Sequence, residues 1–249
     1  MSRRPLVGGN WKMHLLPEEA VAYCRTFAPR VETLGAEVVL FPSFPLLPAV
    51  ASELAGTAAG CGGQDLHADD SGAHTGDVSG AQLAAVGCRW VLCGHSERRH
   101  DHGESDELVG RKAAAARRHG LLPLICVGET RAERASGRTH EVVDRQLRTA
   151  LPEGVDRFAL AYEPVWAIGS GETATPETAQ GAHAFLRRTL ADLRGAEVAA
   201  ACRILYGGSV KHGNAAELAA GPDLDGFLVG GASLDPEGFL AIIGVYGSS

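Results

Sequence analysis

Short apolar segments rich in Val, Leu and Ile alternate along the chain with longer segments in which Ala, Arg and Glu recur at helical spacing. Such short runs are typical of buried strands, and the longer segments are typical of helices that connect parallel strands. The pattern predicts eight strands, at Leu6–Gly9, Val38–Phe41, Ala58–Gly62, Trp90–Cys93, Leu122–Val127, Ala159–Tyr162, Ile204–Tyr206 and Phe227–Val229. It predicts eight helices, at Glu18–Val31, Leu46–Leu54, Gln82–Ala85, Asp106–Arg118, Val142–Ala150, Pro176–Leu193, Ala215–Ala219 and Pro236–Ile243. Helix starts are indicated by Pro17, Ser105, Thr175 and Asn214, and helix ends by Gly120 and Gly195.

Eight strand–helix units at a spacing of about thirty residues fit either a closed barrel or a large doubly wound sheet. Polar or glycine-rich clusters follow the first, fourth, sixth, seventh and eighth strands. A barrel takes its ligand groups from the carboxyl ends of many strands, whereas a doubly wound sheet concentrates them at one switch point. The clusters therefore favour an α/β fold of the (β/α)8-barrel type. Because no linker or low-complexity stretch interrupts the chain, residues 1–249 are predicted to form a single domain.

Composition narrows the class of function. A chain of 249 residues with 45% hydrophobic residues can bury a full barrel core. Its formal net charge is −7, and no block of like charges is present. This balance argues against long-range attraction to nucleic acid or to an anionic membrane. Any anionic ligand must therefore be held by local dipoles and a few cations.

The cellular setting is predicted to be the cytoplasm. The amino-terminal segment has no apolar run of signal-peptide length, and no later stretch reaches membrane-spanning length. Six cysteines are scattered without a C-x-x-C pair, at Cys24, Cys61, Cys88, Cys93, Cys126 and Cys202. We expect them to be reduced core residues rather than zinc ligands or disulfides.

Directly after the first predicted strand, the segment Gly9-Asn10-Trp11-Lys12-Met13 places an amide and an ammonium group at the presumed barrel mouth. Lysine is rare in this chain, with three lysines against 20 arginines. Taken alone, Lys12 fits a solvated loop lysine as well as a ligand for an anion.

A second candidate follows the fourth strand, where His95 precedes Ser96-Glu97-Arg98-Arg99. This run could begin a short helix whose backbone N–H groups face His95, and a helix amino terminus disfavours a positive imidazole. In isolation, His95 could equally be a packed core histidine. The segment lacks the final glycine of the G-x-S-x-G nucleophile motif.

The sixth strand ends in Glu163, and an apolar loop runs from Pro164 through Ile168 to the pair Gly169 and Gly171. Permanent exposure of such apolar side chains to water is unfavourable, so the loop is predicted to be a lid that closes over a ligand. The alternative is a rigid loop packed on neighbouring elements. Under a closed lid, desolvation would raise the basicity of Glu163.

Two further clusters end the seventh and eighth strands: Tyr206-Gly207-Gly208-Ser209 and Val229-Gly230-Gly231-Ala232-Ser233. Glycine lets the backbone approach an anion closely, and successive N–H groups form a phosphate cradle without any arginine. The common phosphate site of barrels lies in these two loops. Neither a P-loop nor a G-x-G-x-x-G motif is present, which disfavours a nucleotide ligand.

Five segments together resemble the triosephosphate isomerase family, in order from residue 8 to residue 234. They are Gly-Asn-Trp-Lys-Met, Gly-His-Ser-Glu-Arg-Arg, Tyr-Glu-Pro-Val-Trp-Ala-Ile-Gly, Tyr-Gly-Gly-Ser and Leu-Val-Gly-Gly-Ala-Ser-Leu. The resemblance implies a TIM barrel that interconverts dihydroxyacetone phosphate and glyceraldehyde 3-phosphate through an enediolate. It implies that no cofactor and no metal is required.

The resemblance also implies a role for each site residue. Glu163 would be the base, His95 the neutral electrophile, and Lys12 the cation that holds the substrate and the developing enediolate charge. Asn10 would orient the substrate, and Glu97 would support the site by pairing with Lys12. The implied backbone ligands of the phosphate are Gly169, Ser209, Gly230 and Gly231.

A homodimer is implied as well, because residues 72–77 correspond to a loop that reaches into the partner subunit in this family. Three positions depart from the usual pattern. His74 stands where an aromatic residue is common, Asp77 where glutamate is usual, and Glu172 where lysine often lies at the second hinge of the lid. The first two bear on dimer packing and the third on lid kinetics.

Two alternatives remain at this stage. A Schiff-base aldolase needs a lysine in an apolar strand, and Lys12, Lys112 and Lys211 all fall in predicted loops or helices. A non-catalytic phosphosugar-binding barrel would need the cradle but not Glu163 or His95, and this chain has both.

Overall fold

The architecture is a closed barrel of eight parallel strands surrounded by helices, in a computed structural model that describes residues 3–169 and 172–247. Strand order follows the sequence around the barrel, and β1 closes the ring by pairing with β8. The strands are β1 (Leu6–Asn10), β2 (Glu37–Phe41), β3 (Ala59–Gly63), β4 (Trp90–Cys93), β5 (Leu122–Val127), β6 (Ala159–Tyr162), β7 (Arg203–Tyr206) and β8 (Gly226–Val229). The (β/α)8 prediction is confirmed, and all eight predicted strands are present with ends shifted by at most one residue.

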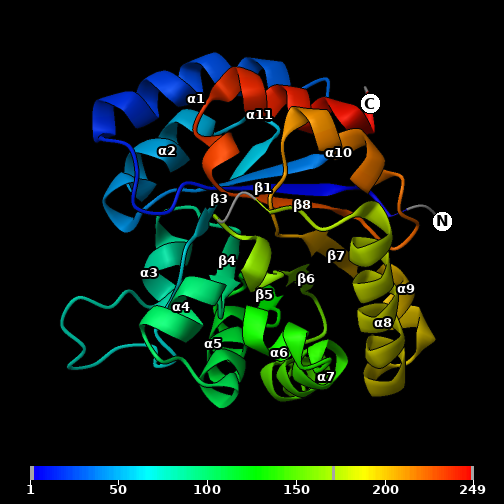
Figure 1. The fold of residues 1–249 in the computed structure, drawn as a ribbon. Helices are drawn as coiled ribbons and strands as arrows, with labels where there is room; N and C mark the ends of the chain where they lie inside the picture. The colour runs from blue at the N-terminus through cyan, green and yellow to red at the C-terminus, as the bar shows by residue number, and fades with distance from the viewer. Residues whose placement is uncertain (1–2, 170–171, 248–249) are drawn as a thin grey trace.

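Helices cover the outside of the barrel (Figure 1). They are α1 (Pro17–Val31), α2 (Leu47–Leu54), α3 (Gly80–Ala85), α4 (Ser96–Asp101), α5 (Asp106–Arg118), α6 (Arg131–Ala135), α7 (Thr139–Ala150), α8 (Pro176–Arg194), α9 (Ala196–Ala201), α10 (His212–Ala219) and α11 (Pro236–Ile243). Short 3-10 turns lie at η1 (Phe44–Leu46), η2 (Val165–Ala167), η3 (Gly231–Ser233) and η4 (Gly244–Tyr246). The described helices include every predicted helix, together with α6 and α9, which were not predicted.

Two of these helices differ instructively from the prediction. Asn214 was predicted to start α10, but this helix begins at His212. Asn214 lies in the first turn, where its side-chain oxygen accepts the N–H of Lys211 at 2.8 Å. The sequence analysis missed α6, although its start could have been predicted. Thr130 and Glu133 form a capping box in which each side chain accepts a backbone N–H.

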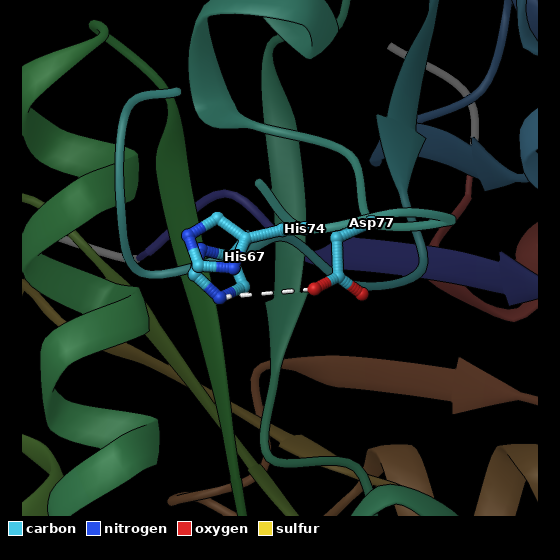
Figure 2. A group of neighbouring side chains, drawn as sticks. All are labelled: His67, His74 and Asp77. Atoms are coloured by element: carbon cyan, nitrogen blue, oxygen red, sulfur yellow. Dashed lines mark ion pairs between the residues drawn. The ribbon is translucent and has the colours of Figure 1, made fainter. Parts of the chain in front are cut away.

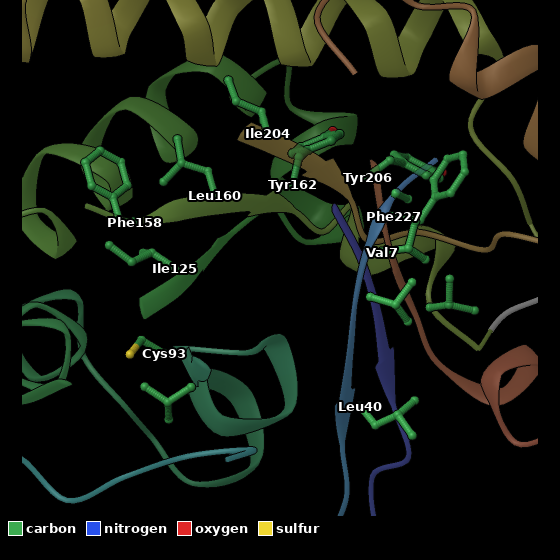
Figure 3. Packing of buried hydrophobic residues seen from close by; sticks show 14 of the residues in the cluster. Val7, Leu40, Cys93, Ile125, Phe158, Leu160, Tyr162, Ile204, Tyr206 and Phe227 are labelled. Carbon is green, nitrogen blue, oxygen red and sulfur yellow. The ribbon is translucent and has the colours of Figure 1, made fainter. Parts of the chain in front are cut away.

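Alternation of side chains along each strand produces two cores. One set points outward and packs under the helices, as Figure 3 shows for Leu40, Ile125 and Leu160. The other set fills the barrel interior, and Phe41 and Trp90 belong to it. The strand period of two residues therefore explains why nearly every strand residue is buried.

The absence of a side chain at one position of β3 makes room for the ring of Phe41 in the barrel interior. A Cβ atom added at Gly62 would lie 2.5 Å from the ring of Phe41. Glycine at this position therefore lets β3 approach the Phe41 ring, because any larger residue would push the ring or the strand away.

No helix among the described residues combines the length and the apolar character that crossing a bilayer requires. All six cysteines are buried, as predicted, and each is a free thiol.

Candidate active site

A cavity of about 240 Å³ opens at the carboxyl ends of the strands. Nearly all of the predicted site residues line it: Asn10, Lys12, His95, Glu163, Gly169, Ser209, Gly230 and Gly231. Glu97 is the exception. It lines a neighbouring cavity of about 440 Å³ and reaches the site through its partner Lys12. Residues from β1, β4, β6, β7 and β8 thus converge as the barrel topology requires.

The loop after β1 holds Lys12 in an unusual backbone conformation, with φ at +52°. Left-handed backbone is costly for a residue with a side chain. Two neighbours compensate: the side-chain oxygen of Asn10 accepts the Lys12 N–H at 3.0 Å, and the Gln64 amide donates to the Lys12 carbonyl at 2.8 Å. The role of Gln64 was not predicted, since no sequence pattern links it to residue 12.

The ammonium group of Lys12 lies 2.5 Å from the Glu97 carboxylate, which confirms the predicted pairing. Partial burial by itself raises the pKa of Glu97. The hydrogen bond from Lys12, followed by the nearby His95 and by the charge of Lys12, outweighs that effect, so the pKa of Glu97 lies below its ordinary value. Glu97 therefore remains an anion that orients Lys12 at the edge of the cavity.

His95 immediately precedes α4, the short helix expected after β4. Its Nδ1 accepts the N–H of Glu97 at 3.3 Å, and its Nε2 lies 3.2 Å from Oε1 of Glu163. An imidazolium has no lone pair to accept a hydrogen bond, so this arrangement favours the neutral ring with its proton on Nε2. That N–H points into the active-site region, toward the Glu163 carboxylate.

Glu163 directly follows β6, and the residue is only 2% exposed, compared with 6% for His95. Its Oε2 accepts the backbone N–H of Ser96 at 2.8 Å. Space for the carboxylate depends on Gly207, because a Cβ atom at that position would lie 2.9 Å from Cγ of Glu163. The result is a buried carboxylate held by one backbone donor and one imidazole.

The loop that follows Glu163 was predicted to be a lid, because permanent exposure of its four apolar residues to water would be unfavourable. In this structure none of the four apolar residues is fully exposed: Ala167 is buried, and Val165, Trp166 and Ile168 are half-buried. Ile168 lines the active-site cavity. The first half of the loop therefore matches the alternative of a packed loop, and lid closure stays a prediction.

Packing of this loop centres on Glu129, whose side chain is fully buried. Its carboxylate accepts hydrogen bonds from the Trp166 indole at 3.0 Å and from the Tyr162 hydroxyl at 3.0 Å. Burial, followed by the Glu129 charge, raises the pKa of Tyr162 well above its ordinary value, so the phenol stays a donor. The guanidinium of Arg134 lies 4.1 Å from the centre of a Trp166 ring.

Glu129 was missed by the sequence analysis, although a signal existed. The run Gly128-Glu129-Thr130 is a polar cluster directly after β5, of the kind that was recognised after five other strands.

In the second half of the predicted lid, Ser170 and Gly171 lie outside the described residues. Glu172 pairs with Arg131 at 3.0 Å.

Residues of both glycine clusters line the cavity, and Lys211 lines it as well. Within the described residues, the backbone N–H groups of Gly208 and Ser209 donate no hydrogen bond. Gly230 lies next to Lys12, since a Cβ atom added there would be 3.6 Å from Cε of the lysine. Free N–H donors beside an ammonium group suit an anionic ligand such as a phosphate.

Comparisons with known proteins agree with this geometry. A family model described as triosephosphate isomerase matches residues 5–246. The triosephosphate isomerase of Moorella thermoacetica is 52% identical over 246 residues, which cover 97% of this chain and 98% of that protein. The one from Symbiobacterium thermophilum is 50% identical, with 96% of each chain covered.

Similarity extends to a solved structure. The crystal structure of triosephosphate isomerase from Bartonella henselae superposes with a TM-score of 0.91 at 40% sequence identity. The superposition covers 98% of this chain and 99% of that one.

Proposed function

This chain belongs to the triosephosphate isomerase family, and from that premise we propose that it interconverts dihydroxyacetone phosphate and D-glyceraldehyde 3-phosphate through an enediolate. This reaction is a step of glycolysis and gluconeogenesis. The observation that carries the assignment is the buried pair of Glu163 and His95, 3.2 Å apart, in a cavity that also contains Lys12.

Proton transfer needs a base beside a carbon and a donor beside the neighbouring oxygen. Glu163 removes the proton from the carbon next to the carbonyl, and the Nε2–H of His95 donates to the oxygen on which charge develops. Lys12 contributes the fixed positive charge, and Asn10 orients the substrate. Binding places the substrate oxygen between His95 and Glu163, so the direct contact of 3.2 Å between them is replaced.

The phosphate group binds to backbone rather than to arginine. Its ligands are the N–H groups of Gly169, Ser209, Gly230 and Gly231, with Lys12 close to Gly230. Closure of the loop after Glu163 excludes water, which protects the enediolate from losing phosphate and strengthens the base.

We propose in addition that the enzyme is a homodimer, with the loop of residues 72–77 inserted beside the partner's active site. Every residue from 71 to 77 is exposed, and the loop between β3 and α3 projects from the barrel at the left of Figure 1. The cavity of about 440 Å³ next to Lys12 is lined partly by Met13, which is 93% exposed. An exposed methionine beside an open cavity is a suitable surface for a partner loop.

Residues 1–249 are proposed to act as one catalytic domain in the cytoplasm. Six free thiols, all of them buried, are typical of a protein that folds in a reducing compartment. The alternatives have little support. Lys12 follows β1, Lys112 lies in α5 and Lys211 precedes α10, so none projects from a strand as a Schiff-base aldolase would require.

A coupled assay tests reaction and substrate together. Purified protein receives D-glyceraldehyde 3-phosphate, and the formation of dihydroxyacetone phosphate is followed through its reduction by an added dehydrogenase. We expect catalytic turnover without added metal or cofactor. Tight binding of the sugar phosphate with no turnover would instead support the non-catalytic binding barrel.

A further inference from the structure

A second lysine borders the active-site cavity and has no part in the mechanism proposed above. Lys211 lines the cavity together with Ser209 and Gly230, two of the proposed phosphate ligands. The residue is exposed, and it lies where the loop after β7 meets α10. We propose that the ammonium group of Lys211 binds the substrate phosphate as a second cation beside Lys12. This inference rests on the proposed isomerase function and adds a ligand to its phosphate site.

Asn214 fixes the backbone of Lys211 relative to the phosphate site. The side-chain oxygen of Asn214 accepts the Lys211 N–H at 2.8 Å, and its amide group donates to the carbonyl of Ser209 at 3.1 Å. The Lys211 carbonyl accepts the N–H groups of Asn214 and Ala215, at 3.1 and 3.0 Å. The backbone polar groups of Lys211 are therefore in use, whereas its flexible four-carbon side chain is free to bring the ammonium group to a ligand.

The charges that line the cavity leave Lys211 as the cation available to an anionic ligand. Lys12 already pairs with the Glu97 carboxylate at 2.5 Å, and Glu163 adds a buried carboxylate. Within the described residues, Lys211 takes part in no ion pair, and no arginine lines the cavity. Because the pair of Lys12 and Glu97 has no net charge, the positive charge of Lys211 is what offsets Glu163 when a phosphate enters.

The histidines on the loop between β3 and α3 add no positive charge to this site. Figure 2 shows His67 and His74 beside Asp77, and none of the three lines the cavity. Nε2 of His67 lies 3.7 Å from the Asp77 carboxylate, and Nε2 of His74 lies 3.2 Å from the Asp69 carboxylate. Any positive charge on these rings is therefore compensated by a carboxylate of the same loop.

Lys211 also has the exposure that substrate capture requires. The formal net charge of the chain is −7, so its long-range field repels an anionic substrate, and a cation exposed at the cavity raises the local substrate concentration. Lys211 does not line the neighbouring cavity beside Met13, where the partner loop is proposed to insert. It therefore stays accessible to substrate in the proposed dimer.

Steady-state kinetics of the full-length protein test this role. In Lys211→Gln we expect KM to rise about threefold to tenfold while kcat changes less than about twofold, because an exposed charge contact contributes to binding rather than to proton transfer. Lys211→Arg keeps the positive charge and should restore most of the wild-type KM. Arg188→Gln is the matched control with the same change in net charge, because Arg188 is exposed on α8 and lines a separate surface pocket.

A substrate without phosphate separates binding of that group from an effect on the chemistry. Turnover of D-glyceraldehyde should be equal in Lys211→Gln and wild type, since the lost contact involves only the phosphate. Inorganic phosphate supplies an equilibrium measurement: by calorimetry, its Kd should rise about threefold to tenfold in Lys211→Gln. Raising the ionic strength should narrow that difference, because salt screens an exposed charge.

The proposal is overturned if Lys211→Gln keeps the wild-type KM and phosphate affinity, or if Arg188→Gln raises KM to the same extent. A fall in D-glyceraldehyde turnover in Lys211→Gln would also contradict it, because the effect would then not pass through the phosphate. Failure of the proposed isomerase function has a different signature. The wild-type chain would then bind inorganic phosphate without converting the sugar phosphate, and the loss of phosphate affinity in Lys211→Gln would remain measurable.

Discussion

Shortening the Glu163 side chain by one methylene tests its proposed role at the scale of a single residue. In Glu163→Asp the carboxylate withdraws by about 1 Å, and we expect kcat to fall by about a hundredfold while binding of a phosphate analogue changes little. Glu107→Asp, the same change on the exposed surface of α5, is the control and should leave kcat and binding unchanged. Wild-type turnover in Glu163→Asp would show that another group is the base.

His95 provides the second prediction at this scale. A neutral imidazole can donate a proton and take it back, whereas a fixed cation would repeat the contribution of Lys12. His95→Gln should therefore retain most substrate binding and lower kcat by about a hundredfold. Nitrogen NMR on the labelled ring, with an enediolate analogue bound at neutral pH, should show one nitrogen with a proton and one without. Two protonated nitrogens would contradict the neutral form.

At the scale of an element, the loop after β6 depends on the buried Glu129 carboxylate. Trp166→Phe keeps an aromatic ring at this position but removes the indole N–H that donates to Glu129. A hydrogen bond to a charged group contributes about 1.5 kcal/mol, so amide exchange at Ala167 and Ile168 should accelerate roughly tenfold. Because lid closure then starts from a less ordered loop, kcat should change as well.

Tyr162→Phe is the matched control for this experiment. It removes another donor to the same carboxylate, but from β6 rather than from the loop. We expect a lower free energy of unfolding without selective acceleration in the loop. Equal exchange rates in Trp166→Phe and wild type would show that Glu129 does not hold the lid.

At the scale of the whole molecule, assembly depends on the loop of residues 72–77. Thr75→Arg places a bulky charge at its exposed tip and should shift the protein toward monomer, as measured by sedimentation. The loss of the partner loop beside Lys12 should lower kcat by about tenfold to a hundredfold. Ala216→Arg, on the exposed side of α10, is the control. A Thr75→Arg protein that stays dimeric and active would refute the proposed interface.

The sequence by itself determined the eight strands, all of the long helices and most residues that line the cavity. Strand and helix periods are local properties, so the apolar runs place β1 to β8 to within one residue. Parallel strands expose their carboxyl ends on one rim, and for that reason Lys12, His95 and Glu163 could be assigned to one site before any distance was known. Errors remained where a local signal was overlooked, as with the capping box at Thr130.

Only the tertiary structure decided which distant residues support that site. Gln64 holds the strained backbone of Lys12, and Glu129 anchors Trp166, through contacts that join segments of the chain far apart in sequence. Such contacts depend on the register between neighbouring strands and on the pairing of Leu6 with Gly226 that closes the barrel. A linear pattern specifies which face a side chain occupies, but not which residue lies opposite, because that is decided by the packing of all eight strands at once.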